Sequence, residues 1–120
     1  MNQQVNQLVM NASDKILAGP DGAQRTPEEE QEFRKQRLAA ALRIFGKFGF
    51  DEGVAGHITV RDPVDTETFW VNPMGRSFKQ VCVSDLIRVD HHGQILEGNG
   101  ILNGAAFTIH GHIHQSRPEV

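Results

Sequence analysis

A chain of 120 residues with a formal net charge of −3 is long enough for one domain with one modest hydrophobic core. Its 12 Lys and Arg residues are scattered, so the basic patch of a nucleic-acid-binding protein is missing, and no apolar run approaches the length of a membrane span. The first 22 residues lack the basic and apolar regions of a secretory signal, which favours a cytoplasmic protein.

Two features of the sequence are predicted to carry no chemistry. Residues 1–25 are rich in Asn, Gln, Gly and Asp with weak apolar periodicity, which predicts a flexible N-terminal arm before a domain at residues 26–120. The only cysteine, Cys82, stands in the apolar stretch VCVSDL, so we expect a small buried hydrophobic residue rather than a nucleophile. A single cysteine also excludes an internal disulfide.

The strongest local signal is a helix that begins after Thr26. Thr26 and Glu29 have the spacing of a capping box, and Pro27 suits the first helical position. Apolar residues then recur at spacings of three and four as far as Phe48, and Gly49 is predicted to end the helix. We expect this apolar stripe to pack on the rest of the domain; it comprises Phe33, Arg37, Ala40 or Ala41, Ile44 or Phe45, and Phe48.

The middle of the chain predicts a glycine turn followed by strands. The alternating pattern at Ile58 and Val60 indicates one strand, and ETFWVNPMG indicates a second strand that ends at Asn72. The sequence SDLIRVDHHGQILEG predicts a hairpin in which His91 and His92 are turn residues.

The final segment, NGAAFTIHGHIHQSRPEV, fits two patterns, because its histidines alternate as in a strand whereas its apolar residues follow a helical face. We favour a helix from the capping residue Asn103 to Arg117, since a residue before proline avoids helical geometry. In a helix, His110 and His114 share one face and His112 points elsewhere. Two histidines without an HExxH glutamate do not complete a zinc site, so we expect bonded or partly exposed histidines, with metal binding as the alternative.

Two glycine-containing turns are the candidate substrate-binding elements. EGVAGH offers backbone N–H groups and a histidine side chain, which suit an anion or a carboxylate, and NPMG offers a second such loop. Alternatively, the glycines serve only the backbone geometry of tight turns. The candidate substrate-binding residues are Gly56, His57, Asn72 and Gly75.

In their order along the chain, the motifs FGKFGFDEGVAGHITVRDP, FWVNPMG, VSDLIRVDHHGQILEG and NGAAFTIHGHIHQSRPEV resemble the class II aldolase and adducin N-terminal domain family over about residues 28–120. The resemblance implies a three-layer α/β/α fold with a central, mostly antiparallel sheet, of which this chain is the N-terminal portion. It also implies a homotetramer with a zinc-type divalent metal and a small-molecule substrate. In the family the metal ligands follow the RPEV-like motif, so we expect them beyond Val120, and no metal site within this chain.

The same resemblance reveals departures from the aldolases of sugar phosphates. Their catalytic glutamate lies four positions before the residue that matches His110, where this chain has Ala106, which cannot transfer a proton. Their phosphate-binding serines match Gly104 and Ala105, and an asparagine of the glycine turn matches His57. We therefore expect no catalytic residue in this chain and a substrate other than a phosphorylated sugar.

The resulting hypothesis is a divalent-metal-dependent, lyase-type enzyme, when full length, that acts on a small hydroxy-carbonyl or oxo-acid, with the metal polarising an oxygen of the substrate. Two alternatives stay open: an adducin-like, non-catalytic oligomerisation module with a cytoskeletal partner, and a metal-dependent oxygenase on the same scaffold. Ala106 favours the interaction module, and the EGVAGH and NPMG loops favour the enzyme. We expect a chain that lacks the following strand to keep an unpaired sheet edge and to be unstable alone.

Overall fold

The computed structural model describes residues 16–120, and residues 1–15 of the predicted arm lie outside the described part. The main elements are two helices and a four-stranded sheet. In chain order they are α1 (Pro27–Lys47), β3 (Thr59–Arg61), β4 (Phe69–Val71), the short 3-10 helix η2 (Val83–Asp85), β5 (Ile87–Val89), β6 (Ile95–Glu97) and α2 (Gly104–Ser116). None of the described helices is long and apolar enough to cross a lipid bilayer.

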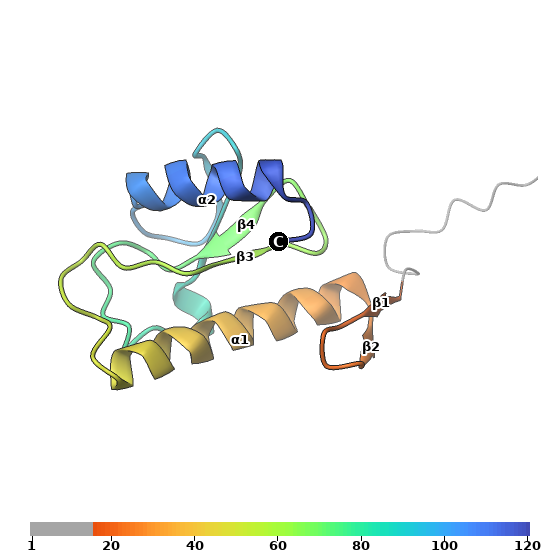
Figure 1. Ribbon diagram of the computed structural model, residues 1–120, viewed down its shortest axis with the longest axis horizontal. Helices are drawn as coiled ribbons and strands as arrows, with labels where there is room; N and C mark the ends of the chain where they lie inside the picture. Colours follow the sequence, from red (N-terminus) through yellow and green to blue (C-terminus); the bar gives the residue numbers. More distant parts are fainter. Residues whose placement is uncertain (1–15) are drawn as a thin grey trace, which may run out of the picture.

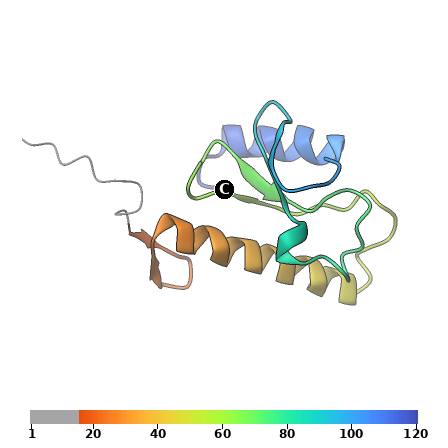
Figure 2. The ribbon, with the colours of Figure 1, turned by 180° about the vertical axis from the view of Figure 1, so that it is seen from behind.

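The sheet separates the two helices. Its strands follow the order β3-β4-β5-β6, and each neighbouring pair is antiparallel. Opposite views show α1 along one side of the sheet and α2 along the other (Figures 1 and 2). The chain therefore has the three-layer α/β/α arrangement with an antiparallel sheet that the family resemblance implies.

Strand β4 divides the hydrophobic core in two, because successive side chains of a strand point to opposite faces. Trp70 packs toward α1, in a cluster with Leu38, Leu42, Phe78, Val81 and Leu86. Phe69 and Val71 lie on the other face, in a cluster with Ile87, Val89 and Ala106 beneath α2. Each helix is thus held to the sheet by its own buried cluster.

The start of α1 confirms the predicted cap. The Glu29 backbone N–H donates to Thr26 Oγ1 at 3.2 Å, and the Thr26 N–H donates to the Glu29 carboxylate at 2.9 Å, with Pro27 at the first helical position. The helix ends at Lys47, and Gly49 follows with a φ of 84°, a left-handed conformation that glycine adopts readily.

The predicted packing face of α1 is wrong. The buried positions in the second half of the helix include Leu38, Leu42 and Gly46, whereas Ile44, Phe45 and Phe48 of the predicted stripe are 57%, 45% and 70% exposed. The helix carries two adjacent apolar stripes, and the buried one includes a close approach to the loop after β4: a Cβ on Gly46 would lie 3.0 Å from the Lys79 backbone nitrogen.

The predicted burial of Cys82 is also wrong, because its side chain is exposed. The adjacent Val81 and the later Leu86 fill the core instead. Cys82 stands at the N-terminus of η2, where its backbone N–H donates to the Asp85 carboxylate at 2.8 Å. The apolar surroundings of Cys82 in the sequence come from its neighbours, which point the other way.

The described part of the predicted arm has a defined structure. Strands β1 (Leu17–Ala18) and β2 (Gln24–Arg25) pair as a short antiparallel ladder. Arg25 forms ion pairs with Asp21 at 2.6 Å and with the buried carboxylate of Glu30 at 3.3 Å. The ladder is therefore tied to the first turn of α1.

The hairpin and the final helix agree with the sequence. His91 and His92 lie in the turn between β5 and β6, where Asp90 Oδ1 accepts the His92 N–H at 2.8 Å. Asn103 caps α2 by accepting the Ala105 N–H at 2.9 Å.

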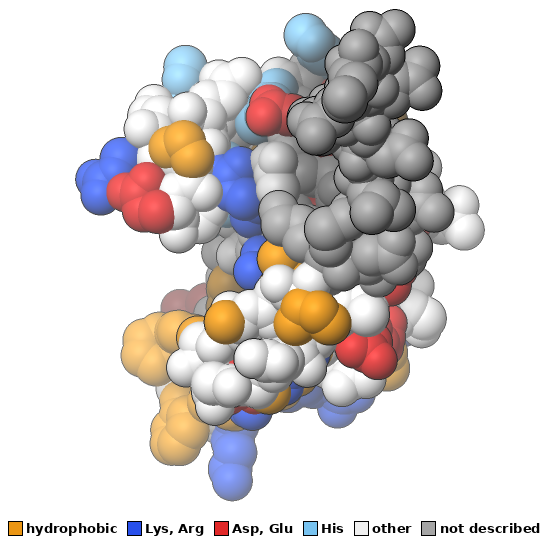
Figure 3. All heavy atoms as spheres, turned by 90° about the vertical axis from the view of Figure 1, so that its right-hand side faces the viewer, with side chains coloured by type: hydrophobic (Ala, Val, Ile, Leu, Met, Phe, Trp, Pro, Cys, Tyr) orange, Lys and Arg blue, Asp and Glu red, His pale blue; other side chains and the backbone are white. Residues whose placement is uncertain are grey.

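Arg61, at the end of β3, fixes the other end of α2. Its guanidinium donates to the main-chain oxygens of His114, Arg117 and Val120, which brings the C-terminus beside β3 (Figure 1). Cations satisfy the free carbonyl groups at the end of a helix in this way. At the end of the molecule seen in Figure 3, acidic and basic side chains lie mixed rather than sorted by sign.

Candidate functional site

The glycine turn before β3 is held at a fixed place by two asparagine side chains. Asn72 Nδ2 donates to the Gly56 carbonyl at 3.0 Å, and the Ile58 N–H donates to Asn72 Oδ1 at 3.1 Å. Asn103 Nδ2 donates to the Ala55 carbonyl at 3.1 Å. The loop is thereby fastened both to the end of β4 and to the start of α2.

Among the predicted substrate-binding residues, Gly56, His57 and Asn72 come together in this loop. A Cβ on Gly56 would lie 2.8 Å from the tip of the Phe78 ring, so any larger residue here would force that ring to shift. Gly75 lies in the exposed turn after β4 with a φ of 85° and open space at its Cβ position. Backbone geometry alone accounts for a glycine at position 75.

A chain of hydrogen bonds runs from the glycine loop through α2. His57 Nδ1 lies 2.9 Å from His110 Nε2, and His110 Nδ1 lies 2.7 Å from Thr59 Oγ1. The same hydroxyl lies 3.0 Å from His114 Nε2, and His114 Nδ1 lies 3.3 Å from the Val120 main-chain oxygen. One threonine of β3 therefore joins two histidines of α2.

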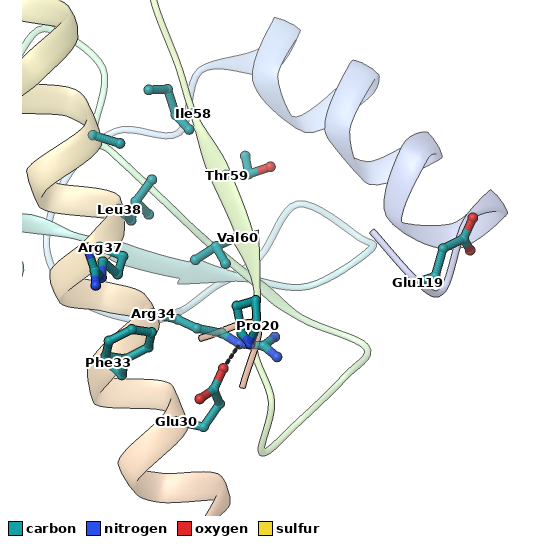
Figure 4. Close-up of a pocket in the computed structure, with 11 residues that line it drawn as sticks. Pro20, Glu30, Phe33, Arg34, Arg37, Leu38, Ile58, Thr59, Val60 and Glu119 are labelled. Carbon is teal, nitrogen blue, oxygen red and sulfur yellow. Dashed lines mark hydrogen bonds and ion pairs between the residues drawn. The ribbon is translucent and has the colours of Figure 1, made fainter. Parts of the chain in front are cut away.

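The helix and the strand place these groups by their regular periods. His110 and His114 are one turn apart and face β3, whereas His112 is exposed, as the helical interpretation predicts. Figure 4 shows Thr59 pointing away from α1 and Val60 pointing toward it. The sequence therefore predicts the histidine pair, but not that Thr59 would be its partner, because that requires knowing which strand lies beneath α2.

Burial favours neutral imidazoles at both positions of α2. It lowers the pKa of His110 below its ordinary value of 6.5, with the adjacent His57 as a second cause. Burial also lowers the pKa of His114, helped by the positive charge of Arg61. His114 is further packed flat against Phe69, with ring centroids 5.0 Å apart. Both rings are thus expected to be uncharged at neutral pH.

The described residues do not fit a divalent metal site. Within residues 16–120, no group of three or more His, Cys, Asp or Glu side chains is arranged to hold a metal ion. The ring nitrogens of His110 and His114 are already hydrogen-bonded to protein groups. No metal-dependent step follows from these side chains.

Ala106 occupies a position in the core. Its side chain is completely buried, in contact with the cluster that contains Phe69, Val71, Ile87 and Val89. A carboxylate placed among these apolar groups would lose its hydration without gaining a partner, which is costly. A catalytic acid or base would therefore have to be supplied by a residue other than Ala106.

A cavity of about 500 Å³ lies between α1 and β3 (Figure 4). Apolar side chains such as Leu38, Ile58 and Val60 line it. Its buried acid, Glu30, is already paired with Arg34 at 2.8 Å and with Arg25. We place the candidate site at the glycine loop and histidines instead, because the cavity borders the outer edge of β3 and its buried acid is already paired with two arginines.

The fold and the fastened glycine loop define an aldolase-like α/β/α domain. The model of the class II aldolase and adducin N-terminal domain matches residues 36–120, and the chain belongs to this family.

Curated relatives include a decarboxylase and an oxygenase. The chain is 45% identical over 97 residues to the decarboxylase NovR of Streptomyces niveus, covering 79% of this chain and 36% of that protein. It is 44% identical over 97 residues to the 4-hydroxy-3-prenylphenylpyruvate oxygenase/4-hydroxy-3-prenylbenzoate synthase of Streptomyces roseochromogenus subsp. oscitans, covering 79% and 35%. The chain spans about a third of the length of these curated relatives.

A solved structure supports the same fold. The L-fuculose 1-phosphate aldolase from Glaciozyma antarctica PI12 is 50% identical and superimposes with a TM-score of 0.76, over 79% of this chain and 40% of that one.

Proposed function

We propose that the chain is part of a divalent-metal-dependent, lyase-type enzyme that acts on a small hydroxy-carbonyl or oxo-acid substrate. The observation that carries this proposal is the His57 ring, bonded to His110 at 2.9 Å within a loop that Asn72 and Asn103 hold in place. A fixed imidazole beside backbone N–H groups suits the oxygen atoms of such a substrate. The names of the relatives, which include a decarboxylase, an oxygenase and an aldolase, support the same class of chemistry.

In this proposal Gly56 and His57 face the substrate, Asn72 fixes their loop, and Gly75 shapes the second turn. A sugar phosphate is a poor candidate, because Gly104 and Ala105 offer no hydroxyl groups where the family's phosphate-binding serines stand. A carboxylate or a carbonyl group needs fewer hydrogen-bond donors than a phosphate group does. The substrate class is therefore proposed to be unphosphorylated.

The metal is proposed from the family and not from the described residues, which do not form a ligand set. When bound, it would supply Lewis-acid stabilisation of charge on a substrate oxygen. We propose zinc, with ligands beyond Val120. The residues described here contribute binding and orientation.

An apolar surface supports assembly into a homo-oligomer, for which we propose a tetramer. Phe45, Phe48, Phe50 and Val54, together called the phenylalanine patch, are 45%, 70%, 67% and 62% exposed. Exposed apolar groups gathered in one region mark interaction sites on soluble domains. A cytoplasmic location is proposed as well, which suits an unpaired, exposed Cys82.

The test uses the longest gene product that contains this sequence. Hydroxy-carbonyl compounds and 2-oxo-acids are incubated with it, with and without zinc or iron, and carbonyl products, carbon dioxide and dioxygen uptake are measured. We expect metal-dependent cleavage, lowered at least about 100-fold in kcat/KM by His57→Ala. His112→Ala is the matched control on exposed α2 surface and should leave turnover unchanged. Dioxygen uptake coupled to turnover would indicate the oxygenase instead.

A non-catalytic, adducin-like interaction module is the second candidate, and the buried Ala106 favours it. Co-sedimentation with cytoskeletal filaments, without turnover of any compound and with no effect of His57→Ala on binding, would support this module and overturn the enzyme.

A further inference from the structure

The hydrogen bonds from His57 to Val120 permit one arrangement of protons when the three imidazoles are neutral. A neutral imidazole has one nitrogen that donates and one that accepts, and a hydroxyl donates only once. The Val120 main-chain oxygen can only accept, so the His114 Nδ1 that lies 3.3 Å away carries the proton. His114 Nε2 must then accept from the Thr59 hydroxyl.

The remaining protons follow in order. The Thr59 hydroxyl has given its proton to His114, so its oxygen accepts from His110 Nδ1 at 2.7 Å. His110 Nε2 is then the accepting atom and receives the His57 Nδ1–H at 2.9 Å. The last ring of the chain, His57, is left with an unprotonated Nε2, and no described residue forms a hydrogen bond with that atom.

We propose that His57 Nε2 is the proton acceptor of the site, and that His110, Thr59 and His114 are positioning residues that fix its tautomer. This inference rests on the proposed function. In the step, the O–H bond of a bound hydroxy-carbonyl breaks and an N–H bond forms at Nε2. The electron pair stays on the substrate oxygen, and the positive charge stays on the His57 imidazole, which still donates from Nδ1 to His110.

Burial and ring geometry fix the donor-to-acceptor direction of these hydrogen bonds. Burial lowers the pKa values of His110 and His114, so neither ring is expected to take a second proton that would reverse a donor. The T-shaped contact of His57 with His110, with planes 86° apart, aims the nitrogen of one ring at the edge of the other. The asparagine clamps fix the backbone that carries His57.

In this proposal, His57 replaces the proton-accepting carboxylate that is absent at position 106. The proposed acceptor comes from the glycine loop and not from α2, and the two histidines of α2 act through it. Matching the sequence to the family shows that the base is absent at position 106, but does not indicate which residue replaces it.

The test is nuclear magnetic resonance of the longest gene product that contains this sequence, labelled with 15N in histidine. Correlations between ring nitrogens and carbon-bound protons show which nitrogen carries the proton. Above the ordinary imidazole pKa, His57, His110 and His114 should each show a protonated Nδ1 and an unprotonated Nε2. The exposed His112 is the control and should show the tautomer mixture of a free imidazole.

Two variants test the positioning role. Thr59→Val has the shape of threonine without its hydroxyl, so His110 and His57 should lose their single tautomer while the backbone spectrum of β3 is retained. Thr59→Ser restores the hydroxyl and should restore the wild-type ring spectra. A general packing defect would not be rescued in this way.

The inference is overturned if His57 shows a protonated Nε2 in the wild type, or if Thr59→Val leaves all ring spectra unchanged. Either result would leave metal-dependent turnover, and hence the proposed function, untouched. Conversely, a protein that shows the predicted tautomers but turns over no compound would overturn the proposed enzymatic function. The assignment of His57 as the ring with the accepting nitrogen would be retained.

Discussion

Trp70 Nε1 donates a hydrogen bond of 2.6 Å to the carboxylate of Asp62, which is completely buried. Asp62 also accepts from Gln31 at 2.6 Å and from the backbone N–H groups of Val64 and Asp65. One side chain thus satisfies donors from α1, from β4 and from the loop after β3, and joins these three parts of the fold.

Replacing that carboxylate should destabilise the fold. Asp62→Ala leaves the Trp70 indole and the Gln31 amide without their acceptor, and we expect a loss of roughly 3 kcal/mol in the free energy of unfolding. Urea denaturation followed by Trp70 fluorescence measures it. Glu52→Ala, at an exposed position, is the control and should change stability by less than about 0.5 kcal/mol. Equal effects of the two changes would show that Asp62 is not the structural centre described here.

The asparagine clamp on the glycine loop makes a second prediction. Asn72→Ala removes the acceptor of the Ile58 N–H and the donor to the Gly56 carbonyl, so the Ile58 amide should exchange with solvent markedly faster and stability should fall by about 1–2 kcal/mol. Hydrogen exchange followed by nuclear magnetic resonance measures this. Asn72→Asp keeps the acceptor and should retain most of the protection of Ile58; exchange that is unchanged in Asn72→Ala would contradict the clamp.

Stability should depend on pH through the histidines of α2. The folded pKa values of His110 and His114 are lowered, so the unfolded state binds more protons as the pH falls below 6.5. Their contribution is therefore present above pH 6.5 and is lost on acidification toward the folded pKa values. Thermal unfolding across this range should show a falling Tm.

The matched variant for the pH effect is the double change His110→Gln and His114→Gln. It removes both titrating rings while keeping polar side chains, so its stability should vary less between neutral and mildly acidic pH. A wild-type chain whose Tm is flat across this window would show that these imidazoles stay exposed to water.

The phenylalanine patch predicts self-association. Changing Phe48 and Phe50 together to serine removes two highly exposed rings and should shift the protein toward monomer at a given concentration. Sedimentation velocity over a concentration series measures the shift. Val64→Ser, a change at an isolated exposed residue, is the control. Identical sedimentation of the double variant and the wild type would place the interface elsewhere.

Metal analysis tests the assignment of ligands. After dialysis against zinc, the 120-residue chain is expected to retain less than one equivalent, because the ring nitrogens of His110 and His114 are occupied by protein partners. One full equivalent in the wild type, lost in both His110→Ala and His114→Ala, would show that the pair binds metal and would require the Thr59 bonds to break.

Local patterns in the sequence were sufficient to predict those elements whose stabilising contacts lie within a few residues of each other. Thr26, Pro27 and Glu29 specify a helix start because all partners lie within one turn. Asn103 likewise caps α2, and the segment ETFWVNPMG predicts the strand that the structure shows at Phe69–Val71. The ordered motifs were enough to indicate the family before any geometry was known.

Tertiary structure decided which of several equivalent surfaces is buried. Phe45 and Leu42 are both apolar residues on α1, and only the position of the rest of the domain buries Leu42 and leaves Phe45 exposed. Cys82 is exposed for the same reason, since its neighbours turn toward the core.

The site shows the same division. Helical spacing by itself determined that His110 and His114 share a face, because that relation depends only on the 3.6-residue period. Their hydrogen bonds with His57 and Thr59 join residues 51 to 55 positions apart in the chain, and only the packing of α2 on β3 brings those atoms within hydrogen-bonding distance. Patterns of neighbouring residues cannot predict such a contact, because it depends on how the helix α2 packs on the whole sheet.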